Sequence, residues 1–222
     1  MIKKLCLILL LLVGCTSIKE KKDMNEPIRI LCYGDSNTWG FDPEGFRYAK
    51  KDLWTTQLEN RLGENYKVIN AGLNGRTTAL DVWGDDSFNG LTDLPDTLDR
   101  YPDMDVIIFM LGTNDCYVAG NAQDIKNGME ALIQYTKENY KTDTEIVIVV
   151  PAGLEEESYP AQLSRQLAPL YQELADQYDC LYLDGTNLFE LSKVDGVHLS
   201  KQGHKDVAQA LLDLLKENPI KS

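Results

Sequence analysis

The stretch Ile28-Arg29-Ile30-Leu31-Cys32-Tyr33-Gly34-Asp35-Ser36-Asn37 joins an apolar run to a short polar turn. The apolar run predicts a buried β-strand, and the glycine loosens the turn that follows it. A serine directly after a buried strand stands on rigid backbone at the strand's carboxyl end, where α/β proteins bind their ligands. Ser36 is therefore a candidate nucleophile, although serine in this position also commonly caps a helical turn.

Outside this stretch, short apolar runs alternate with segments of helical spacing. Four further strands are expected at residues 66–70, 105–111, 145–151 and 180–184. Helices are expected around residues 53–62, 125–135, 163–174 and 207–215. Strands that are apolar on both faces and separated by helices form parallel sheets covered on both sides. The pattern therefore predicts a single α/β domain, a three-layer α/β/α sandwich around a five-stranded parallel sheet.

Two stretches, residues 39–51 and 76–95, are expected to be irregular because they contain glycine, proline and Asn-Gly. Both follow predicted strand ends, where loops build the ligand site. Their large side chains are candidates for a substrate wall, or alternatively anchor the loops to the core: Trp39, Phe41, Arg47, Trp83 and Phe88. Arg76 is expected to pair with Asp81 or Asp85.

The N-terminus has the pattern of an export signal, with Lys3 and Lys4 before an apolar run at residues 5–13. The run ends in Leu12-Val13-Gly14-Cys15, which resembles the lipobox of bacterial lipoproteins. This resemblance divides the chain into a signal peptide (1–14), a lipidated Cys15 with a flexible tether (15–26) and a folded domain (27–222). It places the protein in the bacterial cell envelope, on the periplasmic or the outer side. The alternative is an ordinary signal peptide that happens to contain Cys15.

The charge balance excludes some partners. The chain has 22 basic and 35 acidic side chains, and loss of the signal peptide would bring its net charge from −13 to about −15. Nucleic acid and anionic lipid headgroups would both be repelled, so we expect membrane attachment through Cys15 alone. Cys32, Cys116 and Cys180 are expected to be free, buried thiols, and the absence of a Cys/His cluster predicts no metal site.

The chain contains two histidines, so a histidine base would be one of them. A turn across Gly196-Val197 would bring Asp195 onto the ring of His198 and fix its tautomer. His204 lies in the first turn of the last predicted helix and lacks a carboxylate at such spacing. His198 is therefore the better candidate base, and its alternative is a loop residue that caps the last helix.

Donors for an oxyanion are expected after the second and third strands. Gly75 can present a bare backbone N–H, and Asn114 offers a side-chain amide. The alternatives are a turn for Gly75 and a cap or Asx-turn for Asn114. Thr38 stands where an α/β-hydrolase elbow, Gly-x-Ser-x-Gly, would have its second glycine, so Ser36 does not lie on that kind of elbow.

Four sequence blocks resemble those of the SGNH (GDSL-like) hydrolases, in the same order. They are Gly34-Asp35-Ser36-Asn37, Gly75, Gly112-Thr113-Asn114-Asp115 and Asp195-Gly196-Val197-His198. The resemblance covers most of residues 28–215 and implies a flavodoxin-like fold. It implies that Ser36 is the nucleophile, that His198 is the base oriented by Asp195, and that Ser36, Gly75 and Asn114 form the oxyanion hole. It implies no metal and no organic cofactor.

Within this family, the first block, Gly75-Arg76-Thr77-Thr78 and residues 110–115 look like the arylesterase or acyltransferase branch. That branch often has leucine after the serine, and here Asn37 takes the position. The resemblance implies a serine esterase that hydrolyses small acyl esters such as acetyl esters, including those on a polysaccharide. The alternatives are an acyltransferase or thioesterase with the same site, or a surface lipoprotein that binds glycans without catalysis.

Overall fold

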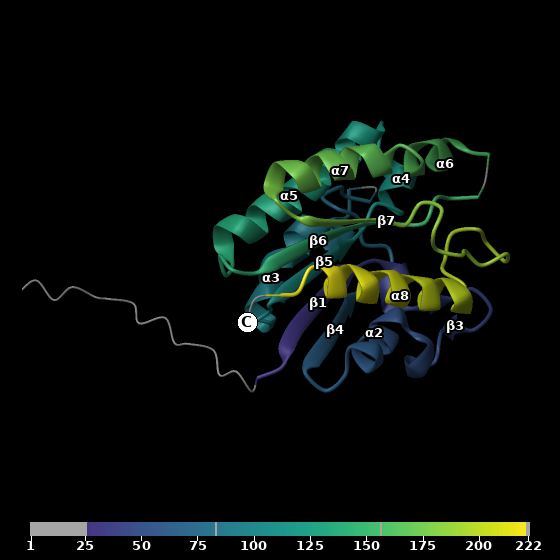
Figure 1. Ribbon diagram of the computed structural model, residues 1–222. Coiled ribbons are helices and arrows are strands. Elements are labelled where there is room, and N and C mark those ends of the chain that lie inside the picture. Colours follow the sequence, from purple (N-terminus) through teal and green to yellow (C-terminus); the bar gives the residue numbers. More distant parts are fainter. Residues whose placement is uncertain (1–25, 83, 156, 221–222) are drawn as a thin grey trace, which may run out of the picture.

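The computed structural model describes residues 26–82, 84–155 and 157–220 (Figure 1). The signal, Cys15 and Trp83 lie outside these residues. The sheet has five strands in the order β4-β1-β5-β6-β7, and all neighbouring pairs are parallel. The strands are β1 (Ile28–Gly34), β4 (Tyr66–Gly72), β5 (Val106–Met110), β6 (Glu145–Val150) and β7 (Leu181–Asp184). If only these five strands are numbered, in chain order, their order in the sheet is 2-1-3-4-5. This is the flavodoxin-like order, which confirms the predicted fold.

The two faces of the sheet build two cores. In β1, Ile30 and Cys32 point into one core and Leu31 and Tyr33 into the other, as alternation along a strand requires. The first core is covered by α2 (Trp54–Leu62) and α8 (Lys201–Glu217), and the second by α3 (Gly90–Arg100), α5 (Ala122–Asn139) and α7 (Leu167–Tyr178). Figure 1 shows α2 and α8 on one side of the sheet and α5 and α7 on the other. The three-layer prediction is confirmed.

Several short elements complete the fold, mostly at the carboxyl edge of the sheet. They are α1 (Ser36–Trp39), β2 (Phe41–Asp42), β3 (Phe46–Arg47), α4 (Asp115–Val118), α6 (Tyr159–Ser164) and the 3₁₀ turns η1 (Lys50–Asp52) and η2 (Asp86–Phe88). The strands β2 and β3 pair as an antiparallel ribbon, Phe41 opposite Arg47. Residues 39–51 are thus partly ordered into a ribbon.

Two predictions of secondary structure need correction. Residues 76–95 are not irregular throughout, because α3 begins at Gly90: the Asn89 side chain accepts from the backbone N–H groups of Leu91 and Thr92 and so caps the helix. The helix expected at residues 163–174 is divided into α6 and α7. Arg165 and Gln166 between them keep right-handed helical dihedrals, so one helix follows the other without an extended connection.

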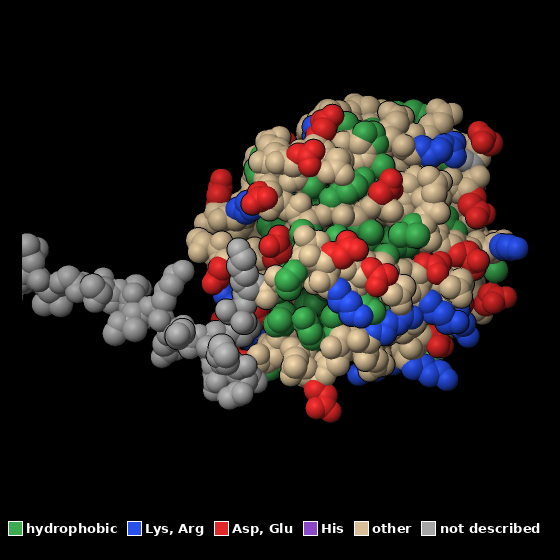
Figure 2. Space-filling view, viewed as in Figure 1, with side chains coloured by type: hydrophobic (Ala, Val, Ile, Leu, Met, Phe, Trp, Pro, Cys, Tyr) green, Lys and Arg blue, Asp and Glu red, His purple; other side chains and the backbone are tan. Residues whose placement is uncertain are grey.

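The surface matches the acidic composition. On the face shown in Figure 2, acidic side chains are scattered over the whole surface, and hydrophobic ones form only small groups. Among the described helices, none is both long and apolar enough to cross a bilayer. Cys32 and Cys116 are free and buried as predicted, and Cys180 is free but only half-buried.

His204 is a buried structural residue on α8. Its Nδ1 accepts a hydrogen bond from the backbone N–H of Trp54 at 3.2 Å, and its ring packs edge-on against Tyr48. Burial lowers the pKa of His204 from 6.5 to about 4, against a smaller opposing effect of Asp52. The geometry therefore joins the starts of α2 and α8 and keeps this imidazole neutral.

We expect His204 to make the fold sensitive to acid. Between pH 6.5 and about 4 the unfolded chain binds a proton at this ring and the folded chain does not, so stability falls as the pH is lowered through this window. The loss amounts to about 3 kcal/mol for this group. The raised pKa values of Asp35 and Asp115 have the opposite effect, a stability that falls as the pH rises. Because both residues are present in the wild type and in the His204 variant, their effect cancels in the comparison. Urea unfolding of the wild type and of His204→Asn, which keeps an acceptor near Nδ1, should give stabilities that converge on acidification; parallel curves would contradict the assignment.

Candidate active site

Ser36 stands at the first position of α1, directly beyond the carboxyl end of β1. The cap of α1 is Asp35, whose Oδ1 accepts from the Asn37 N–H at 2.8 Å, and Gly40 ends the helix with φ of 97°. Ser36 is therefore not the capping residue, and its hydroxyl is left available. The short helix aims that hydroxyl at the loop that follows β7.

That loop brings His198 and Asp195 to the serine. His198 Nε2 lies 3.1 Å from Ser36 Oγ, and His198 Nδ1 lies 2.7 Å from Asp195 Oδ2. The other carboxylate oxygen, Oδ1, accepts from the backbone N–H groups of Val197 and His198 at 3.0 and 3.1 Å. Because both oxygens are engaged, the carboxylate has one orientation. The structure thus brings together the three residues predicted as a triad.

The electrostatics fix the direction of these hydrogen bonds. Burial raises the pKa of Asp195, but the hydrogen bonds from His198 and from the backbone of His198 and Val197 outweigh it and lower the pKa below its ordinary value. The carboxylate is therefore ionised at neutral pH and can only accept. Nδ1 must then carry the ring proton, so that Nε2 is free to accept the Ser36 hydroxyl proton.

The backbone N–H groups of Ser36 and Gly75 and the side-chain amide of Asn114 lie at the same edge of the sheet. Among the described residues, neither the Ser36 nor the Gly75 N–H donates a hydrogen bond within the chain. Gly75 has φ of 82°, and a Cβ there would lie 3.0 Å from the ring of Phe88, so a side chain would be strained at this position. Asn114 donates through Nδ2 to the backbone oxygen of Arg76 at 3.0 Å, which orients the amide and leaves its second N–H available.

Arg76 is buried and holds the turn that carries Gly75. It pairs with Asp93 at 2.7 Å rather than with Asp81 or Asp85, so the predicted partners are wrong. It also donates to the backbone oxygen of Gly34 at 2.9 Å and lies over the ring of Tyr33. Arg76 therefore ties the end of β1 to the Gly75 turn and is occupied by these contacts.

Two further buried carboxyl groups lie beneath the site. Burial raises the pKa of Asp35 to about 7 and that of Asp115 to about 6. Asp115 accepts from the Thr78 N–H at 2.9 Å and from its hydroxyl at 2.5 Å, which fixes the far end of the Gly75 turn. The sequence offered no signal for this pairing beyond the position of Asp115 in the block 112–115.

The residues predicted to form a substrate wall divide into two groups. Phe41 packs against the His198 ring, with centroids 4.4 Å apart, and Phe88 lies beside Gly75. Trp39 instead packs against Phe46 and lies under the Arg47 guanidinium, 4.3 Å from the ring centroid. Phe41 and Phe88 thus border the site directly, whereas Trp39 and Arg47 form a stack on the adjoining ribbon.

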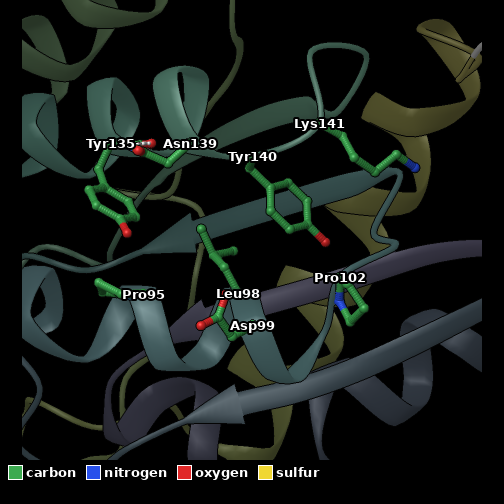
Figure 3. A pocket seen from close by; sticks show the side chains of 8 residues that line it. All are labelled: Pro95, Leu98, Asp99, Pro102, Tyr135, Asn139, Tyr140 and Lys141. Atoms are coloured by element: carbon green, nitrogen blue, oxygen red, sulfur yellow. Dashed lines mark hydrogen bonds between the residues drawn. The ribbon is translucent and has the colours of Figure 1, made fainter. Parts of the chain in front are cut away.

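The linings of two surface hollows include none of Ser36, Asp195 and His198. One, of about 660 Å³, lies between α2 and the edge strand β4 and includes Arg47, Thr55 and Asn70. The other, of about 300 Å³, lies between the ends of α3 and α5, where Figure 3 shows Leu98 and Tyr140. Among the described residues, no group of three or more His, Cys, Asp or Glu side chains is placed to hold a metal ion.

A serine linked through histidine to an ionised aspartate, beside free N–H donors at the carboxyl edge of a flavodoxin-like sheet, defines a carboxylic ester hydrolase of the SGNH type. The sequence matches the GDSL-like Lipase/Acylhydrolase family over residues 32–205, and the chain belongs to this family.

Solved structures agree with this assignment. A carbohydrate acetylesterase family member from Sinorhizobium meliloti is 37% identical with a TM-score of 0.79, covering 86% of this chain and 98% of that one. The aryl esterase of M. smegmatis is 30% identical with a TM-score of 0.79, covering 86% and 99%. A curated relative, the uncharacterized lipoprotein YqeF of Bacillus subtilis, is 30% identical over 112 residues, 50% of this chain and 41% of that protein. This match therefore spans less than half of the lipoprotein's length.

Proposed function

We propose that the protein is a serine esterase that hydrolyses small acyl esters, acetyl esters among them, through Ser36, His198 and Asp195. The observation that carries the proposal is the hydrogen-bond chain from Ser36 Oγ to His198 Nε2 and from His198 Nδ1 to Asp195. In this arrangement the histidine has a free lone pair directed at the serine hydroxyl.

The reaction follows in two steps. Ser36 Oγ attacks the ester carbonyl while His198 Nε2 takes the hydroxyl proton, and Asp195 stabilises the imidazolium that forms. The oxyanion accepts hydrogen bonds from the N–H groups of Ser36 and Gly75 and from the Asn114 amide. His198 then gives its proton to the departing alcohol, and an acyl-enzyme remains. Water, deprotonated by His198, releases the acid and restores Ser36.

The relatives and the aromatic border of the site support a proposal for the substrate class. The Sinorhizobium relative is a carbohydrate acetylesterase family member, and Phe41 and Phe88 lie at the site in positions to contact an acyl group or a leaving group. We therefore propose small acyl esters with an alcohol or carbohydrate leaving group. An acceptor alcohol that reached the acyl-enzyme would convert the same machinery into a transferase.

Three measurements on the domain from residue 27 test this proposal and its transferase alternative. Hydrolysis of p-nitrophenyl acetate and longer esters, followed by product release, should be fastest with short acyl chains. Phosphonate labelling followed by peptide mass spectrometry should place the label on Ser36. The ratio of new ester to free acid with added alcohol separates transfer from hydrolysis. No ester hydrolysis at any chain length, or a label elsewhere, would refute the proposal.

Asn114→Ala should lower kcat about 10²- to 10³-fold, because one donor to the oxyanion is lost. KM should change little, since the donor acts mainly in the transition state. Steady-state kinetics on p-nitrophenyl acetate measure both constants. A loss of less than threefold would remove Asn114 from the oxyanion hole.

We also propose that the chain is anchored in the envelope through a lipidated Cys15, with residues 16–26 as the tether of the domain. Support comes from the lipobox-like sequence and from the relative that is named a lipoprotein. The strand β1 begins at Ile28, at the opposite end of that strand from Ser36, so its amino end lies away from the site. Labelling with a radioactive fatty acid in wild type and Cys15→Ala tests the anchor.

A further inference from the structure

The placement of His198 against Ser36 poses a geometric problem. Ser36 follows β1, whereas His198 follows the edge strand β7, and β5 and β6 lie between them. Three strand spacings amount to about 14 Å. The loop after β7 must cross this distance, so the strand that precedes His198 does not determine where its ring lies.

Hydrogen bonds inside the loop make it rigid, but they do not fix its position relative to Ser36. Ser192 N–H donates to the His198 carbonyl at 2.7 Å, and Gly196 N–H donates to the Ser192 carbonyl at 2.8 Å. Together with the Asp195 contacts, these bonds hold Asp195 and His198 as one unit. None of them reaches Ser36 or α1, so the unit needs a separate attachment to the serine.

Asn37 makes that attachment. Its side-chain Oδ1 accepts from the backbone N–H of Leu199 at 2.8 Å, a buried bond between residues 162 positions apart in the chain. Asn37 directly follows Ser36, and Leu199 directly follows His198. The bond therefore joins the two segments one residue beyond the Ser36–His198 contact. We propose that Asn37 is a positioning residue, which sets the distance between His198 Nε2 and Ser36 Oγ; this inference rests on the proposed function.

Asn37 is itself held in place from the other side. Its backbone oxygen accepts from Trp54 Nε1 at 3.2 Å, and the backbone N–H of Trp54 donates to His204 Nδ1 on α8. Since α8 begins just beyond Leu199, these bonds close a ring that runs through Asn37, Trp54, His204 and Leu199. The oxygen that receives the Leu199 N–H is therefore anchored to α2 and α8, and it cannot follow the loop if the loop shifts.

Leucine, the residue that the arylesterase branch often has here, would fill the same space without an acceptor. Asn37→Leu would leave the Leu199 N–H buried without a partner and would remove the hydrogen bond that joins the His198 unit to α1, so that packing contacts such as that of Phe41 alone would hold the ring near Ser36. Because a displacement of about 1 Å in a catalytic group costs about 10²-fold in rate, we expect kcat to fall 10- to 100-fold with KM nearly unchanged. Asn37→Asp keeps an oxygen in place and should restore most of kcat, and its added charge should appear as a shift of the pH–rate profile.

Tyr140→Phe is the matched control. The Tyr140 hydroxyl accepts from the buried backbone N–H of Met104 at 2.9 Å, at the amino edge of the sheet (Figure 3). Its loss also removes the acceptor of a backbone N–H, but far from the site. The control should lower the melting temperature as Asn37→Leu does and leave kcat within twofold of the wild type.

Kinetics of the three variants are combined with ¹⁵N NMR of the His198 ring. The inference predicts low kcat together with altered His198 signals for Asn37→Leu, and neither change for Tyr140→Phe. Wild-type kcat in Asn37→Leu, or equal losses in Tyr140→Phe, would overturn it while the proposed function stands. If the wild type shows no Ser36-dependent activity, the proposed function fails instead, and unchanged His198 signals in Asn37→Leu would still overturn the positioning role.

Discussion

Ser36→Ala is expected to lower kcat about 10⁶-fold on p-nitrophenyl acetate, because the atom that attacks the carbonyl is removed. The N–H groups of residue 36 and Gly75 and the Asn114 amide remain, so a residual rate of about 10³-fold over water should persist. The fold should be unaffected, since the Ser36 side chain makes one hydrogen bond, to His198, and the helix cap is Asp35.

The measurement is steady-state hydrolysis together with thermal unfolding of the same samples. An unchanged melting temperature assigns the loss to chemistry. Ser36→Ala should also fail to take up a phosphonate label that the wild type binds. More than 1% of wild-type activity in a preparation free of wild-type enzyme would indicate another nucleophile.

Asp195→Asn is expected to lower kcat about 10⁴-fold while the site keeps its shape. The reason lies in the two backbone N–H groups of Val197 and His198 that donate to Oδ1. They require an oxygen at that position, so the asparagine must turn its NH₂ toward His198 Nδ1. His198 Nδ1 then accepts a hydrogen bond from this NH₂, so the ring proton must lie on Nε2. With Nε2 protonated, His198 can no longer take the proton of Ser36.

Asp206→Asn provides a matched control for this substitution. Asp206 is on α8 and accepts from Gln202 Nε2 at 2.8 Å, away from the proposed triad. It should retain wild-type kcat. Ring ¹⁵N NMR should show the Nε2–H tautomer of His198 in Asp195→Asn and the Nδ1–H tautomer in both the wild type and the control. A loss of less than tenfold in Asp195→Asn would mean that another group orients the histidine.

The layered fold could be predicted from the sequence because apolar periodicity reports burial directly. The β1 run is buried on both faces, as expected for a central parallel strand. The helix α3 was missed because Asn89-Gly90 and Pro95 usually mark loops; in the structure Asn89 caps the helix, and the proline is accommodated within it. Local signals of this kind do not distinguish a turn from the start of a helix.

The sequence by itself determined which segments form the strands of the sheet and which residue types lie at the site. Chemistry limited the base to one of two histidines, and Asp195 lies close enough in the chain to reach His198 through a local turn. The second conclusion depends on residues that are near each other in the chain, whose contacts follow from backbone geometry.

Only the tertiary structure decided the role of Asn37 and the partner of Arg76. The bond from Leu199 to Asn37 joins residues 162 positions apart, and Arg76 pairs with Asp93 on the unforeseen helix α3. Such contacts depend on how the loop after β7 crosses the sheet and on where each helix packs. A polar side chain meets such a partner only when that packing has formed, so the residues near it in the chain do not predict which partner it will have.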